Sequence, residues 1–121
     1  MATGPRLISI VTCLEASAGR HYTLHDVFRS LPAVPERIAV YLEFAASEGF
    51  SYELDLVREG GKSTYESEQT LVLRNLSGRV EEVVELPVGL SGALPGSYTI
   101  EVRDAETSLL FGSRKVFFGE M

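Results

Sequence analysis

The sequence predicts an all-β protein in which about seven to nine antiparallel strands form a two-layered sandwich with little or no helix. Three observations support this prediction. Apolar and polar residues alternate along several segments, as they do in strands with one buried and one solvated face. Glycine and proline residues separate these segments. The chain has 121 residues, enough for one buried core, so we expect a single domain over residues 1–121.

Strict alternation marks three segments: 37–45, 52–58 and 97–104. In the first of them, apolar side chains occupy every second position, and Tyr41 lies on the opposite face. Five further segments have a strand-like composition with less regular alternation: Arg6–Leu14, His21–Arg29, Ser67–Arg74, Arg79–Leu86 and Leu109–Phe118. The best helical candidate, residues 44–49, allows one turn at most.

Turn-forming residues lie between the predicted strands. Gly60-Gly61 predicts a β-hairpin, because the turns that fit hairpins need residues with positive φ. A longer connection is expected over Leu86–Gly96, which is rich in proline and glycine. Further turns are expected over residues 75–78 and 104–108.

The segment Ala93–Asp104, ALPGSYTIEVRD, resembles the penultimate strand of immunoglobulin-like and fibronectin-type sandwiches. The resemblance implies that Pro95-Gly96 makes a sharp bend into the strand. It also implies that Tyr98 points inward and returns its hydroxyl to the nearby backbone, an arrangement called a tyrosine corner.

More of the chain is similar to a family of short bacterial proteins, each built as a single immunoglobulin-like domain. The similarity rests on two opening strands, a central pair and two closing strands: LISIVTCL with GRHYTLHDVFRSLP, RIAVYLEFA with SYELDLVREGGK, and LPGSYTIEVRD with LLFGSRKVFF. It implies an immunoglobulin-like sandwich and supplies no catalytic residue. The chain departs from antibody domains, since it has one cysteine and no tryptophan.

Composition argues against several classes of function. The net charge is −6 and the basic residues are scattered singly, whereas surfaces for nucleic acids or anionic membranes need concentrated positive charge. No segment approaches the roughly 20 apolar residues of a membrane helix. The apolar run over residues 7–14 is short and interrupted, so we expect a strand there rather than a secretion signal. We therefore expect a soluble cytoplasmic protein that binds neither nucleic acid nor membrane.

Cys13 is the only cysteine, so no disulfide can form within the chain. A zinc site that needs two or more thiolates within one chain is excluded for the same reason. The neighbours of Cys13 are apolar, which predicts a buried thiol rather than a nucleophile.

The two histidines, His21 and His25, are four residues apart in GRHYTLHDVF. This spacing allows a shared metal ion on a helix, but on a strand it separates the pair by about 13 Å. The composition favours a strand, so we expect two exposed histidines and no metal site. Strict alternation would then turn Asp26 inward, and we predict a bulge or bend there that keeps its carboxylate in water.

Two groups of acidic residues are candidate calcium ligands at an edge of the sandwich: Glu81 and Glu82 with Glu85, and Asp104 with Glu106. Adjacent strand residues point to opposite faces, and the sequence has no acidic calcium-binding loop, so a solvated face is the better interpretation. The stretch Gly60–Thr64 is similar to part of a P-loop, but it lacks the first glycine and a following helix. A hairpin accounts for it better.

Two places in the sequence indicate contact with a partner. Tyr41 lies on the outward face of its predicted strand. The last strand is apolar on both faces, with Phe111 and Phe117 opposite Val116, and such a strand is either covered on both sides or part of an interface. A bulge at Gly112 that switches the faces is an equally good alternative. Tyr41, Phe111 and Phe117 are the candidate interface residues.

These observations favour a non-catalytic protein-interaction or assembly module that binds a protein partner or a second copy through a sheet face or edge. A sandwich that binds carbohydrate or calcium is the alternative. An enzyme is the least expected class, because no nucleophile–base pair or metal constellation is compatible with the expected strand geometry. We assign no catalytic, cofactor-binding or metal-binding residue.

Overall fold

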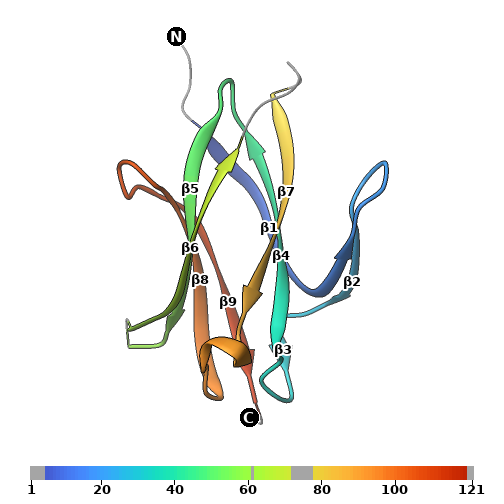
Figure 1. Cartoon of the computed structure of the whole chain (residues 1–121), viewed down its shortest axis with the longest axis vertical. Helices are drawn as coiled ribbons and strands as arrows, with labels where there is room; N and C mark the ends of the chain where they lie inside the picture. Colours follow the sequence, from blue (N-terminus) through green and yellow to red (C-terminus); the bar gives the residue numbers. More distant parts are fainter. Residues whose placement is uncertain (1–4, 61, 72–77, 120–121) are drawn as a thin grey trace.

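The computed structural model describes residues 5–60, 62–71 and 78–119 and places two β-sheets face to face (Figure 1). Within these residues there are nine strands, one short 3-10 turn called η1 (Gly89–Ser91) and no α-helix. The strands are β1 (Arg6–Ser17), β2 (Thr23–Val27), β3 (Ser30–Leu31), β4 (Arg37–Ala45), β5 (Phe50–Arg58), β6 (Lys62–Leu71), β7 (Arg79–Pro87), β8 (Gly96–Asp104) and β9 (Leu110–Phe118). The all-β prediction is confirmed. No helix in this part of the chain is long and apolar enough to cross a membrane.

The strands divide into a four-stranded sheet with the order β2-β1-β4-β7 and a five-stranded sheet with the order β3-β9-β8-β5-β6. The described pairs are antiparallel, with one exception. The two-residue strand β3 runs parallel to the end of β9, so that Ser30 pairs with Phe117 and Leu31 with Phe118. The chain therefore changes sheets between β2 and β3, where it crosses from one layer to the other.

The core fills the space between the two sheets. Every second side chain of β4, β5 and β8 is buried there, as the alternation predicts: Ile38, Val40, Leu42, Phe44, Tyr52, Leu54, Leu56, Tyr98, Ile100 and Val102. Aromatic rings from both layers meet in this space. The ring centroid of Phe44 on β4 is 4.9 Å from that of Tyr52 and 5.0 Å from that of Phe50, both on β5 of the other sheet. Aromatic pairs at these separations add to the hydrophobic stabilisation of the core.

The tyrosine corner implied by the sequence is present at the start of β8. Tyr98 is buried, and its hydroxyl donates a hydrogen bond of 2.5 Å to the backbone carbonyl of Leu94. The bond satisfies a phenolic hydroxyl that would otherwise be buried without a partner. It also fixes the connection from η1 to the strand that carries one side of the core.

The hairpin predicted at Gly60 is present between β5 and β6. Gly60 has a φ of 106°, a backbone conformation that residues with a Cβ rarely adopt. Arg58 pairs with Lys62 across this turn, so β6 begins at Lys62 and not at the predicted Ser67. The prediction was wrong because tight hairpins keep both strands paired up to the turn. The end of that predicted strand, residues 72–74, and residues 75–77 of the predicted turn lie outside the described residues.

The first two predicted strands are present with different bounds. β1 continues to Ser17, because its second half leaves β4 and pairs with β2 instead. In Figure 1 this second half and β2 project beyond the edge of β4. β2 is shorter than the predicted segment 21–29, since the chain turns after Val27 to reach the other sheet. His21 therefore lies in the connection before β2 and not on the strand, which corrects the sequence prediction.

The side chain of Arg114 connects the two sheets. It lies on the inner face of β9, in register with buried Ile100. Its guanidinium donates hydrogen bonds to Thr12 Oγ1 at 2.9 Å, to the Phe28 carbonyl at 3.3 Å and to the Ile10 carbonyl at 3.4 Å. The Thr12 hydroxyl in turn donates to the Phe28 carbonyl at 2.5 Å. Burial, followed by the nearby charge of Arg29, lowers the pKa of Arg114.

We expect Arg114→Met to lower the free energy of unfolding by about 1–3 kcal/mol, because it leaves oxygen atoms at the sheet junction without a donor. Urea denaturation followed by circular dichroism measures this change. Arg37→Met is the matched control, since Arg37 is exposed on β4 and its replacement should change stability by less than about 0.5 kcal/mol. Equal stabilities of the two variants would contradict the role of Arg114.

Candidate functional site

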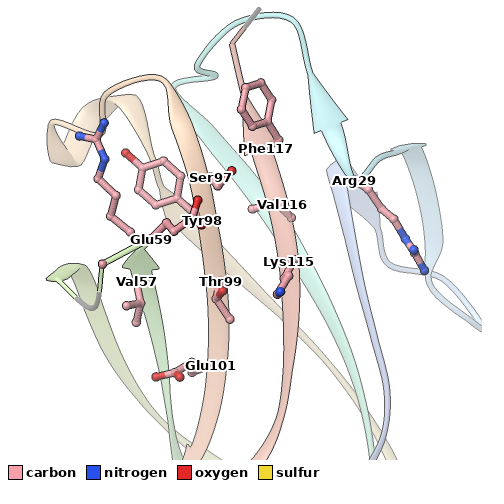
Figure 2. A pocket seen from close by; sticks show the side chains of 12 residues that line it. Arg29, Val57, Glu59, Ser97, Tyr98, Thr99, Glu101, Lys115, Val116 and Phe117 are labelled. Atoms are coloured by element: carbon pink, nitrogen blue, oxygen red, sulfur yellow. The ribbon is translucent and has the colours of Figure 1, made fainter. Parts of the chain in front are cut away.

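A groove of about 500 Å³ lies on the outer face of the five-stranded sheet, over β5, β8 and β9 (Figure 2). Val57, Thr99 and Lys115 form one row across these strands, and Ser97 and Phe117 form the next. The small side chain of Ser97 on β8 lies beside the larger Phe117 on β9. The lining also includes Glu59 and Gly60 of the β5–β6 turn and Arg29 of the connection between β2 and β3.

The groove combines apolar and charged groups. Val57 and Phe117 are partly exposed and provide its apolar surface. Lys115 and Arg29 are exposed at the β9 border, and neither makes an ion pair or side-chain hydrogen bond within the described residues. Arg58 is held differently, because its guanidinium donates to the Pro95 carbonyl at 3.2 Å. Within the described residues, Lys115 and Arg29 are therefore unpaired cations beside a hollow that Glu59 and Glu101 also line, on a protein whose net charge is −6.

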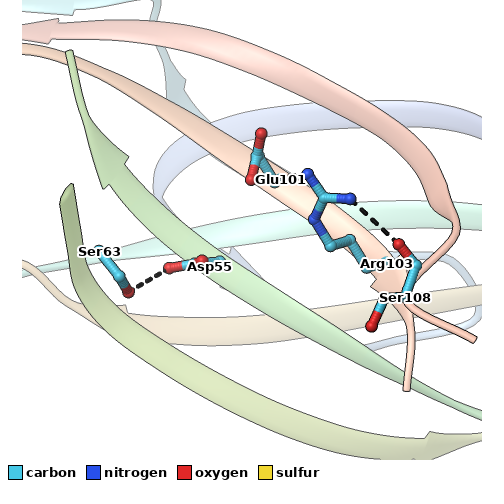
Figure 3. Close-up of polar contacts among 5 residues, drawn as sticks. All are labelled: Asp55, Ser63, Glu101, Arg103 and Ser108. Atoms are coloured by element: carbon cyan, nitrogen blue, oxygen red, sulfur yellow. Dashed lines mark hydrogen bonds and ion pairs between the residues drawn. The ribbon is translucent and has the colours of Figure 1, made fainter. Parts of the chain in front are cut away.

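Further along the same outer face, polar side chains of β5, β6 and β8 contact one another (Figure 3). Asp55 of β5 accepts a hydrogen bond of 2.5 Å from the Ser63 hydroxyl of β6. On β8, Glu101 and Arg103 form an ion pair of 3.2 Å, and Arg103 also donates to the Ser108 carbonyl at 3.1 Å. The polar side chains in the middle of the face are thus satisfied locally.

The three candidate interface residues lie in three different places. Phe117 borders the groove. Tyr41 lies on the outer face of the other sheet, where its hydroxyl donates to Glu81 Oε2 at 2.6 Å and its ring meets the edge of Tyr22. Burial, and then the hydrogen bond to Glu81, raise the pKa of Tyr41. The structure therefore does not bring these residues together in one site.

Phe111 packs into the sandwich, with its ring centroid 6.0 Å from that of Phe44 and 5.8 Å from that of Phe50. The register between β8 and β9 shifts here, so that Phe111 is an extra residue between Leu110 and Gly112. The bulge that the sequence offered as the alternative explanation of the last strand is present. Gly112 faces Leu7, whose Cδ2 would lie 2.8 Å from a Cβ at this position, so a larger residue would not fit without movement.

No protein-family model matches the chain, and no curated protein matches it either. Inferences about function therefore depend on the residues and their geometry.

The histidine segment has the predicted distortion. His25 is exposed on β2, and its Nε2 lies 3.0 Å from the Ser17 hydroxyl. Asp26 adopts a left-handed backbone conformation with a φ of 57° and is exposed. The β1–β2 register is the same on both sides of Asp26, so the distortion is a bend without an inserted residue. No cluster of three or more potential metal ligands occurs in the described part of the chain.

Cys13 is fully buried on β1, as the sequence predicts. Its thiol lies 3.7 Å from the carbonyl oxygen of Ala39 on the neighbouring strand β4. Burial raises the pKa of the Cys13 thiol, which keeps it in the protonated, unreactive form. The thiol is therefore a packing group of the four-stranded sheet.

Glu82 is a partly buried acid that the sequence did not reveal, since all the β7 glutamates were expected on a solvated face. In the register with β4 it lies opposite Leu42, and therefore on the inner face, whereas Glu81 lies on the outer one. The hydroxyl of buried Tyr52 donates to Glu82 Oε1 at 3.4 Å. Burial raises the pKa of Glu82, and this hydrogen bond only partly opposes the effect.

The raised pKa of Glu82 means that the folded protein holds this proton more tightly than the unfolded chain. The free energy of unfolding should therefore fall as the pH rises above 4.5, the ordinary pKa of a glutamate, because the unfolded chain releases the proton first. We expect Glu82→Gln to be more stable than the natural protein at neutral pH, with the difference shrinking as the pH falls through this window.

Urea denaturation at a series of pH values measures the difference. Glu85→Gln, a change on the exposed side of the same strand, should follow the pH profile of the natural protein. A constant difference between Glu82→Gln and the natural protein at every pH would contradict the role assigned to Glu82.

Proposed function

We propose that this protein is a non-catalytic protein-interaction module with an immunoglobulin-like fold, and that it binds a protein through the outer face of the five-stranded sheet. The observation that carries the proposal is the groove on this face, where Lys115 and Arg29, unpaired within the described part of the chain, border the apolar side chains of Val57 and Phe117. Protein interfaces combine desolvated aromatic groups with a charged rim in this way.

The strand order supports the immunoglobulin-like part of the proposal. Strands β1, β4 and β7 pair in the order of strands A, B and E of that fold, and β9, β8 and β5 pair in the order of strands G, F and C. The tyrosine corner of Tyr98 lies at the start of β8, the strand that corresponds to F. Fold alone does not assign a function, so the binding role depends on the groove.

The chemistry of the groove supports binding over catalysis. The lining contains no histidine or cysteine. Within the described residues, the hydroxyl groups of Ser97 and Thr99 make no side-chain hydrogen bond to the possible bases Lys115, Glu59 and Glu101, which also line the groove. Activation of a hydroxyl nucleophile needs an adjacent base within hydrogen-bond reach. The groove is also open and built on three neighbouring strands, a geometry suited to an extended protein surface.

A photo-crosslinking amino acid in place of Thr99, incorporated in the native cell, tests this proposal. We expect a covalent adduct of one defined mass, because Thr99 lies at the centre of the groove. The same amino acid in place of Val83, on the outer face of the other sheet, is the matched control and should give no such adduct.

Phe117→Arg should abolish the Thr99 adduct, since it places a large charged group where the apolar contact forms. Thermal unfolding of this variant establishes that it is folded. Identical adducts from Thr99 and Val83, or an adduct that a folded Phe117→Arg variant still forms, would contradict binding through the groove.

A further inference from the structure

The outer face of the five-stranded sheet has an acidic and a basic border, with the ion pair of Glu101 and Arg103 on β8 between them. The acidic border consists of Glu53 and Asp55 on β5 and Glu66 on β6. The basic border consists of Lys115 on β9 and Arg29, whose backbone carbonyl accepts a hydrogen bond from the amide of Phe117. The strand order β9-β8-β5-β6 keeps the two borders on opposite sides of the groove.

Four of the charged side chains on these borders are unpaired within the described residues of one copy, whereas Asp55 accepts a hydrogen bond from Ser63. Glu53 and Glu66, like Lys115 and Arg29, make no ion pair or side-chain hydrogen bond within the described residues. Lys115 and Glu66 lie on strands separated by three inter-strand spacings, about 14 Å, which is too far for a direct ion pair. A second molecule with complementary charges can pair with both borders at once.

A second copy of the same chain has the required arrangement. Lys115 and Glu66 lie in different rows, two residues apart along the strands. A two-fold axis in the plane of contact, inclined to the strands by this offset, turns the face over and exchanges its two borders. The basic border of each copy then lies on the acidic border of the other, and the same contact forms twice. Complementary charge of this kind fixes the register of an interface and opposes wrong partners.

The dimensions of the face set the expected strength of the contact. Four strands about 4.8 Å apart and nine residues of about 3.3 Å each give a face of about 19 by 30 Å. Two such faces bury roughly 1,200 Å² in total, at the lower limit of specific interfaces. The contact therefore suits a reversible dimer that forms and dissociates with concentration.

We propose that the partner of the groove is a second copy of this chain, bound face to face as a two-fold symmetric dimer in which Lys115 and Arg29 of each copy meet the acidic border of the other. This inference rests on the proposed function and names the partner of the same surface. It requires the apolar side chains of Val57 and Phe117 to become buried at the centre of the contact.

Sedimentation velocity over a range of protein concentrations tests the proposal. The natural protein should approach twice the monomer mass as its concentration rises, and added salt should shift this transition to higher concentration. Lys115→Glu and Glu66→Lys should each weaken dimerisation by about tenfold or more, because each places like charges together at two equivalent contacts. A mixture of the two variants should regain the dimer, since every contact between them again joins opposite charges.

Two variants on the other sheet control for the change in net charge. Arg37→Glu matches Lys115→Glu, and Glu15→Lys matches Glu66→Lys, and both controls should dimerise like the natural protein. A dimer that neither groove variant weakens would overturn the proposal. A mixture that stays monomeric, when each variant alone is monomeric, would overturn the two-fold arrangement and with it the proposal.

The outcome also separates this inference from the proposed function. A natural protein that remains monomeric overturns the dimer, whatever the crosslinking experiment gives. If the Thr99 adduct then has the mass of a different protein and depends on Phe117, the groove still serves as a binding site. If no Thr99 adduct forms either, both the dimer and the proposed function fail.

Discussion

The hydrogen bonds of the Arg114 guanidinium are the interaction on which the arrangement of the two sheets depends. The side chain extends from β9 of one sheet to backbone and hydroxyl oxygens of β1 and the segment after β2. A cation in this partly buried position needs several acceptors, and it finds them in Thr12 and the carbonyls of Ile10 and Phe28. The contact holds the chain where it leaves one sheet, so that β3 can pair with β9 in the other.

The position of the groove depends on this crossing of the chain between the two sheets. Pairing with β3 fixes the end of β9, and the backbone of Arg29 accepts the amide of Phe117 there. The bulge at Phe111 then decides which side chains of β9 point inward, because one extra residue exchanges the two faces of the strand. Phe111 fills the core as a result, whereas Lys115 and Phe117 reach the outer face.

Polar groups serve different purposes in the two sheets. The Tyr41 hydroxyl donates to Glu81 on the outer face of the four-stranded sheet, and the Tyr52 hydroxyl donates to Glu82 on its inner face. These hydrogen bonds satisfy the polar groups within the molecule and affect the stability of the four-stranded sheet. On the outer face of the other sheet, Glu101 and Arg103 form an ion pair in the middle. The cations at one border and the exposed glutamates at the other make no ion pair within the described residues. Unpaired opposite charges on one rigid face contribute little to folding, and they are suited to recognition of another molecule.

The sequence by itself determined the features that depend on neighbouring residues. Alternation fixed the inner faces of β4, β5 and β8, Gly60 placed the hairpin, and the short segment from Leu94 to Tyr98 contained the tyrosine corner. Asp26 also marked a bend, because an inward carboxylate is costly to bury.

Only the tertiary structure decided the features that depend on residues far apart in the chain. The inward position of Glu82 comes from its register with β4, and the position of Phe111 comes from the bulge opposite β8. The two charged borders come from the strand order, which brings Arg29 beside β9 and sets Glu66 on the far side of the sheet. Alternation along a strand determines which residues share a face, but strand pairing alone determines which neighbours they meet there.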